Sequence, residues 1–143
     1  MRVDFYHLTE DPVAAALCDL AGKVLSAGQR LLVVCEGDEA RAVLSEALWA
    51  APGFIANGES GQDGAAEQPV LLARSLPDGA PANGARIIAY ADGAWRDPPA
   101  AFDRALHLFD EATIEAARQA WRSLDEAERH YWKKENGRWG KML

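Results

Sequence analysis

Five consecutive apolar residues, Leu31-Leu32-Val33-Val34-Cys35, decide the class of fold that this chain can adopt. An apolar run of this kind is typical of a strand that is covered on both faces, as in a parallel sheet with helices on either side. The segments before and after it have helical periodicity. The first begins at Pro12 and stops at Gly28, and the second runs from about Asp38 to Trp49. This order of helix, strand and helix predicts the α/β class.

The rest of the chain continues the alternation of strands and helices. Further strands are expected at Val3–Leu8, Pro69–Ala73, Arg86–Ala91 and Leu106–Phe109, with a very short one at Phe54-Ile55. Helices are expected near Ala100–Arg104 and over Asp110–Leu124, and a mobile loop over Ala56–Gln68. The pattern predicts a single Rossmann-like domain over 1–143 with three layers and a mostly parallel sheet. The pattern does not decide whether the segment 126–143 is ordered.

Composition restricts the classes of function. The chain has 143 residues and a formal net charge of −7, which argues against broad binding of nucleic acid because phosphate contacts supply most non-specific affinity. No apolar segment fits a signal peptide or a membrane span, so we expect a cytoplasmic protein without membrane contact. The two cysteines, Cys18 and Cys35, lie in apolar patterns and are expected to be buried, reduced thiols.

The motifs of cofactor and metal sites are absent from the sequence. The glycines of the expected loop are not followed by the Lys-Ser/Thr pair of a phosphate-binding loop, and no GxGxxG follows a strand. The three histidines, His7, His107 and His130, lack the local spacing of a metal site. We therefore expect no cofactor, no metal and no catalytic residue. One enzymatic alternative stays open, with Cys35 at the end of its strand as nucleophile and His7 as its base.

The stretch Arg118–Leu143 differs from the rest of the chain in charge and in aromatic content. It has seven Lys or Arg against four Asp or Glu, a net +3, which leaves −10 for the preceding residues. Three of the five tryptophans, Trp121, Trp132 and Trp139, lie in it. A cationic and aromatic surface on an anionic body can capture an acidic partner that carries an aromatic group.

Arg118, Trp121 and Arg122 are the candidate binding residues of this stretch. On a helix their i, i+3 and i+4 spacing places them side by side, where two guanidiniums can bind a carboxylate next to an apolar indole. The alternative is structural, with Trp121 packed in the core and the arginines paired with Glu115 and Asp125. The residues alone leave both interpretations open.

Two other aromatic segments have the same ambiguity. Trp49 ends the second helix and Phe54 follows a Pro-Gly break, where an aromatic side chain either covers the core or contacts a partner. The segment Arg129–Lys141 can stack bases and pair phosphates, or it can pack its aromatic side chains on the body and leave its lysines in solvent. Direct binding of nucleic acid is therefore a second alternative function.

Over nearly its full length the chain resembles the chi subunit of bacterial DNA polymerase III. The resemblance rests on the order and spacing of six short segments: Val3–Tyr6, Gly28–Cys35, Glu46–Trp49, Phe54-Ile55, Leu108–Asp110 and Ala117–Arg122. It implies a Rossmann-like α/β domain without the dinucleotide fingerprint. It also implies a non-catalytic accessory subunit of the holoenzyme that belongs to the clamp-loader complex.

The resemblance further implies the partners and the site. Chi links the clamp loader, through the psi subunit, to the acidic C-terminal tail of single-stranded-DNA-binding protein, and so meets DNA only indirectly. That tail ends in Phe, which needs an apolar pocket beside basic groups. By similarity, the residues of the tail site are Trp49, Phe54, Phe109, Arg118, Trp121 and Arg122. The aromatic residues of this set would form the pocket walls, and the arginines would bind the carboxylates of the tail.

The chain departs from many relatives at two places. Ala56-Asn57 stands where they have Pro-His, and Leu124–Glu126 stands where they often place another basic residue. Either the tail binds less tightly here, or a later basic residue such as Arg129 or Lys133 compensates.

Overall fold

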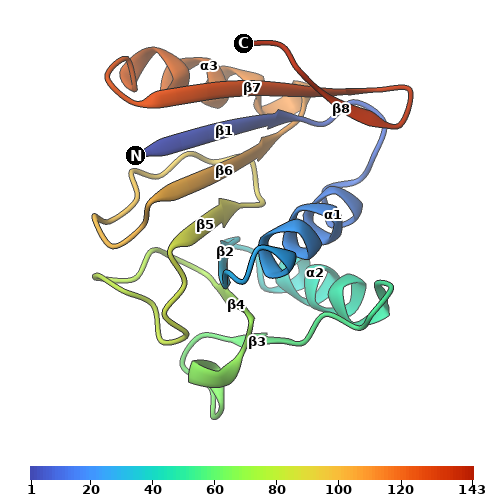
Figure 1. Ribbon diagram of the computed structural model, residues 1–143, viewed down its shortest axis with the longest axis vertical. Helices are drawn as coiled ribbons and strands as arrows, with labels where there is room; N and C mark the ends of the chain where they lie inside the picture. Colours follow the sequence, from blue (N-terminus) through green and yellow to red (C-terminus); the bar gives the residue numbers. More distant parts are fainter.

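One sheet of eight strands forms the centre of the computed structural model, which describes residues 1–143 (Figure 1). The strands are β1 (Arg2–His7), β2 (Leu31–Val34), β3 (Asn57–Glu59), β4 (Val70–Ala73), β5 (Ile87–Tyr90), β6 (Arg104–Phe109), β7 (Glu128–Glu135) and β8 (Arg138–Lys141). Their order is β3-β4-β2-β5-β6-β1-β7-β8, and all neighbours are parallel except the antiparallel pair β7 and β8. The predicted α/β class with a mostly parallel sheet is confirmed.

Helices cover both faces of this sheet (Figure 1). Helices α1 (Val13–Ser26) and α2 (Asp38–Ala50) pack on one face, and α3 (Ile114–Ser123) packs on the other. Two short 3₁₀ helices, η1 (Ala65–Glu67) and η2 (Glu111–Thr113), complete the elements. The three layers follow from the sequence, because β2, β4 and β5 are buried along their whole length and need cover on both sides. None of the helices combines the length and the apolar character that a membrane span requires.

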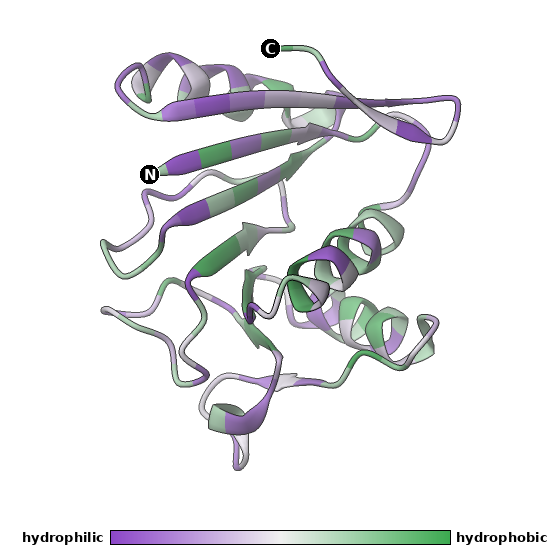
Figure 2. Ribbon diagram, viewed as in Figure 1, coloured by the Kyte–Doolittle hydropathy of each residue, from purple (hydrophilic) through white to green (hydrophobic).

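The hydropathy of the strands falls from the inner strands of the sheet toward β7 (Figure 2). The inner strands are apolar, whereas β7 is largely hydrophilic and has half-buried residues along most of its length. Strand β7 is parallel to β1 but lies near the edge of the sheet, outside the region that α1 and α2 cover (Figure 1). Its side chains therefore alternate between the two faces of the sheet, and its sequence contains no apolar run. For this reason the sequence alone does not assign this segment to a strand.

Three local predictions were wrong. No helix forms near Ala100–Arg104, because Phe102 is buried in the core and Arg104 already pairs in β6. Phe54-Ile55 is not a strand, since Phe54 has a left-handed backbone with φ of 52°, and β3 begins only at Asn57. The expected loop from 56 to 68 instead contains β3 and η1.

The open segment 126–143 forms a hairpin. Strands β7 and β8 are joined at Asn136 and Gly137, whose φ angles of 52° and 75° are both positive. Such a pair fits the two-residue turns that match the twist of a hairpin. After β8 the chain runs back along β7, where the Tyr131 N–H donates to the Leu143 carbonyl oxygen and the Met142 N–H donates to that of Tyr131. The hairpin thereby places Tyr131 and Leu143 next to α3.

Candidate functional site

A hollow of about 260 Å³ opens between α3 and the strands beneath it, β1, β6 and β7. Most of its walls are apolar or aromatic, and its only charged residues are two arginines. The residues that line it are Phe5, Phe109, Ile114, Ala117, Arg118, Trp121, Arg122, Tyr131 and Leu143. A hollow of this composition suits an apolar side chain attached to an anionic group.

The alternation of side chains along parallel strands builds the aromatic part of the hollow. Phe5 on β1 is in register with Tyr131 on β7 and with His107 on β6, so all three side chains lie on the α3 face of the sheet. Trp121 packs edge-to-face on Phe5, with ring centroids 5.2 Å apart. Phe109, at the end of β6, lies 6.1 Å from the Tyr131 ring. These contacts fix the aromatic walls before any ligand arrives.

Helix α3 supplies the positive charge. Asp110 caps the turn that leads into it, since its carboxylate accepts from the Thr113 N–H and the Thr113 hydroxyl accepts from the Asp110 N–H. Arg118 and Arg122 follow at i and i+4 and both line the hollow. Arg118 is paired with Glu115 at 2.8 Å in an exposed, weak ion pair. The Arg122 side chain is exposed and has no hydrogen bond or ion pair within the protein, so its guanidinium is free for a ligand.

A third arginine reaches this region from β7. Arg129 lies over the Trp121 ring, with its guanidinium carbon 4.6 Å from the ring centroid, and it donates a hydrogen bond to the Trp121 carbonyl oxygen. The sequence suggested Arg129 or Lys133 as a basic residue that compensates for the acidic segment Leu124–Glu126. Of these two, it is Arg129 that contacts Trp121.

The structure brings together four of the six residues predicted for the site. Phe109, Arg118, Trp121 and Arg122 all line the hollow. Trp49 and Phe54 do not, because α2 crosses from β2 to β3 on the face of the sheet opposite to α3 (Figure 1). They lie near the end of α2, where their side chains are 48% and 75% exposed. The structure therefore does not bring all six residues together in this hollow.

Several residues of the hollow were missed from the sequence. Phe5, Tyr131 and Leu143 line it, but they were not among the predicted site residues. Tyr131 and Leu143 lie in the segment 126–143, to which the sequence assigned no structure. The signal that could have placed them is the Asn136-Gly137 pair, which lies between two alternating segments. Phe5 could be found only from the strand order, which brings β1 between β6 and β7.

The matches with known proteins decide the family. Residues 1–131 match the family model of the DNA polymerase III chi subunit, HolC. The chain belongs to this family. The chi subunit is a non-catalytic accessory subunit of the DNA polymerase III holoenzyme and takes part in DNA replication. No curated protein matches the chain. All residues that line the hollow except Leu143 lie within the part that matches the chi family.

The geometry around Cys35 and His7 agrees with a non-catalytic chi subunit. Cys35 follows β2 and His7 ends β1, and because β5 and β6 lie between these strands, three spacings of about 4.8 Å separate the two residues. Burial raises the pKa of the Cys35 thiol, and the nearby charge of Asp92 raises it further. The ring nitrogens of His7 are bonded to Tyr131 and Glu111 instead. No nucleophile and base are therefore paired here.

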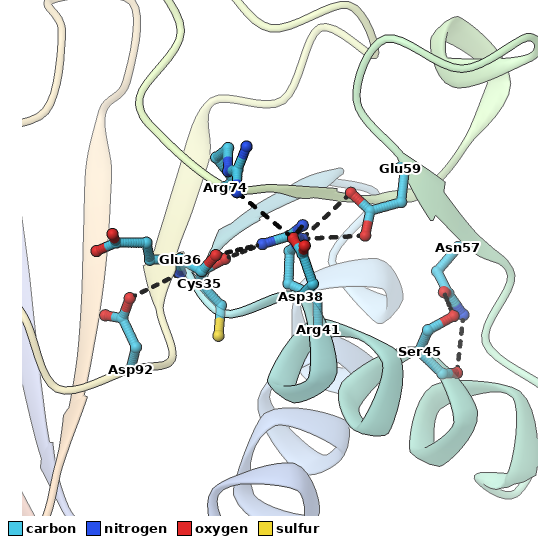
Figure 3. A network of polar contacts seen from close by, with 9 residues as sticks. All are labelled: Cys35, Glu36, Asp38, Arg41, Ser45, Asn57, Glu59, Arg74 and Asp92. Carbon is cyan, nitrogen blue, oxygen red and sulfur yellow. Dashed lines mark hydrogen bonds and ion pairs between the residues drawn. The ribbon is translucent and has the colours of Figure 1, made fainter.

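At the carboxyl end of β2, where open α/β sheets often bind ligands, a network of polar contacts is centred on Arg41 (Figure 3). Arg41 is buried and donates to the carbonyl oxygens of Cys35 and Glu36 at 2.8 and 2.7 Å. It also pairs with Asp38 at 2.5 Å and with Glu59 at 3.0 Å. Each nitrogen of its guanidinium is thus occupied, and the network ties α2 to β2 and β3. No group of three or more His, Cys, Asp or Glu side chains could hold a metal ion.

The aromatic residues of the hairpin are packed against the body. Trp132 stacks on Tyr6 with ring centroids 6.1 Å apart and donates to the buried Asp4 carboxylate at 2.9 Å. Lys134 lies over the Trp139 ring, 5.8 Å from its centroid. A platform for single-stranded nucleic acid needs exposed ring faces along its length. This packing argues against direct binding of nucleic acid by the segment Arg129–Lys141.

Proposed function

We propose that this chi-family protein binds the acidic, Phe-terminated C-terminal tail of single-stranded-DNA-binding protein in the hollow between α3 and β7. One observation carries the proposal, which is an aromatic hollow bordered by Arg118 and by the unpaired Arg122. A terminal phenylalanine side chain gains about 1.5–3 kcal/mol from burial among such walls. Its neighbouring carboxylates then lie within reach of two guanidiniums, which bind carboxylates bidentately.

The distribution of charge supports the same partner. Residues Arg118–Leu143 have a net charge of +3 on a chain whose other residues sum to −10. They form the second half of α3 and the hairpin, which lie together at one end of the sheet (Figure 1). An acidic tail is repelled by the body and attracted to this end, and such steering raises the rate of association.

The test is a titration of a peptide of the cognate tail against two matched arginine variants. Arg122→Ala removes a free guanidinium at the hollow and should weaken binding by about 30-fold, because a desolvated, paired arginine contributes ~2 kcal/mol. Arg138→Ala removes the same charge from exposed β8, outside the hollow, and should change the affinity by less than about threefold. Equal effects of the two variants would show that only net charge matters and would refute the site.

We further propose that the link to the psi subunit or the clamp loader uses the opposite face. Val43 in the middle of α2, Trp49 near its end and Phe54 just beyond it are exposed there, at 58%, 48% and 75%. Apolar side chains grouped in this way commonly mark an interface with another protein. A bridging subunit needs two surfaces that can be occupied at once, and α2 and α3 lie on different faces of the sheet.

A further inference from the structure

Strand β8 is the outermost strand of the sheet at the end near α3, and one of its two edges has no neighbour (Figure 1). Its inner edge pairs with β7, in a register that places Lys133 opposite Gly140. The chain then continues along β7, where the Met142 N–H donates to the Tyr131 carbonyl oxygen at 2.7 Å. The next residue, Leu143, lines the hollow. The open edge of β8 therefore leads to the hollow.

The main-chain groups on this open edge are those of Trp139 and Lys141. In an antiparallel pair, residues that exchange hydrogen bonds with the neighbouring strand alternate with residues whose N–H and C=O groups point away from it. Met142 bonds to β7, and by alternation Gly140 and Arg138 face β7 as well. The N–H and C=O groups of the residues between them therefore point outward. No strand of the sheet lies beyond β8 to pair with these groups, and such an edge is a template for another strand.

We infer that the open edge of β8 pairs with the extended acidic segment that precedes the terminal phenylalanine of the tail, as one added strand. This inference rests on the proposed function, because it names a second contact of the same partner. The hollow takes the last side chain, and β8 takes the main chain of the residues before it. Strand β8 lies outside the part of the chain that matches the chi family, which ends at residue 131.

The position of the hollow sets the direction of the added strand. Strand β8 runs toward the hollow, and a tail whose last residue lies in the hollow runs the same way along the edge, so the two strands are parallel. Lys141 lies two residues before Leu143. Since both chains are extended, the residues of the tail that pair with Lys141 precede its last residue by only a few positions.

Charge selects an acidic strand for this edge. From Asn136 to Leu143 the chain has two cations, Arg138 and Lys141, both exposed, and no acid. A second copy of β8 would place like charges opposite each other, which is destabilising. The other edge strand of the sheet, β3, lies in the segment 56–68, which has three carboxylates and no cation. An acidic strand is therefore attracted to β8 and repelled from β3.

The first measurement is a calorimetric titration of the full-length protein with tail peptides in which one backbone amide at a time is N-methylated. In a parallel pair the Trp139 and Lys141 carbonyl oxygens accept from amides that are two residues apart. We expect the affinity to fall about tenfold at two positions of the peptide, with a tolerant position between them. The charges and side chains of the peptide stay the same throughout, so the pattern reports main-chain pairing alone.

Lys141→Pro and Lys141→Ala form the matched pair of protein variants. Both remove the same charge, but only proline removes the N–H that points away from β7. We expect the alanine variant to bind the tail peptide within about threefold of the wild type, and the proline variant to bind about tenfold more weakly than the alanine variant. If the proline variant does not fold, the N-methylated peptides and the wild-type protein still decide.

The outcomes separate this inference from the proposed function. Uniform tolerance of N-methylation, or equal affinities of Lys141→Pro and Lys141→Ala, overturns the pairing and leaves the hollow as the tail site. Self-association that only Lys141→Pro abolishes, with the same peptide affinity as Lys141→Ala, assigns the edge to a second copy and overturns the pairing as well. Alternating sensitivity in a peptide that loses no affinity with its last phenylalanine supports the pairing and overturns the proposed function.

Discussion

His107 is fully buried on β6, and neither of its ring nitrogens has a hydrogen-bond partner. Aromatic rings surround it, among them Phe5 and Trp95, whose centroids each lie 5.6 Å away. Burial lowers the pKa of the imidazole from its usual 6.5 to about 4, because the charged form has no water around it. In the folded protein His107 is therefore neutral down to about pH 4.

This histidine predicts a specific acid sensitivity of the fold. Above pH 6.5 the imidazole is neutral in both the folded and the unfolded protein and contributes no pH dependence. Between pH 6.5 and about 4 only the unfolded chain takes up the proton, so the free energy of unfolding falls by about 1.4 kcal/mol per pH unit, about 3 kcal/mol in all. His107→Leu should remove this slope. Urea denaturation of both proteins at pH 7.5, 6.0 and 4.5 measures it, and parallel losses of stability would contradict the assignment.

The arginines of α3 show how far single residues can be interpreted from sequence. Their spacing along a helix was predictable, and in the structure Arg118 and Arg122 line one hollow with Trp121. The structural alternative was also right in part, because Arg118 pairs with Glu115. Arg122 has no such pair with Asp125, and spacing alone could not show this, since it depends on how α3 ends.

At the scale of elements, the hairpin of β7 and β8 was the largest omission. Its strands carry charged and aromatic residues in alternation, so they lack the apolar run that made β2 evident. The Asn136-Gly137 pair was a local turn signal, but it could not show that β7 adds to β1 in parallel. That pairing is a contact between the two ends of the sequence. Sequence periodicity predicts α1 to α3 well, because the apolar pattern of a helix depends only on residues that are close together in the sequence.

The end of α2 makes its own prediction about the second partner. Trp49→Gln and Phe54→Asn should each weaken the association with the psi subunit or the clamp loader by tenfold or more, because exposed aromatic side chains of this kind are common hot spots. Neither variant should alter the affinity for the tail peptide. Phe54→Asn should fold at least as well as the wild type, since asparagine tolerates the positive φ of 52° better than phenylalanine does.

The measurement is co-elution of each variant with the reconstituted clamp loader, with Arg122→Ala as the matched control. The control should co-elute as the wild type does and lose only the peptide. Wild-type co-elution of both α2 variants would place the second partner elsewhere.

At the scale of the whole molecule, the order of the strands keeps apart the two surfaces to which we assign partners. The strands between α2 and α3 separate two groups of side chains that short segments of sequence suggested as one site. Helix α2, with Trp49 near its end, lies over the half of the sheet that ends in β3, and α3 lies over the half that ends in β8 (Figure 1). The hollow lies beneath α3. Sequence patterns predict the strands but not their order, so they could not distinguish one site from two. The separation suits a subunit that holds two partners at once.

In the proposed function, the hollow receives the terminal phenylalanine of an acidic tail. Calorimetric titration of the full-length protein with the tail peptide, and with the same peptide lacking only its last residue, tests this most directly. We predict that removal of the phenylalanine weakens binding by at least about 30-fold, because it removes the side chain that fills the aromatic walls. Equal affinities for the two peptides would contradict the account.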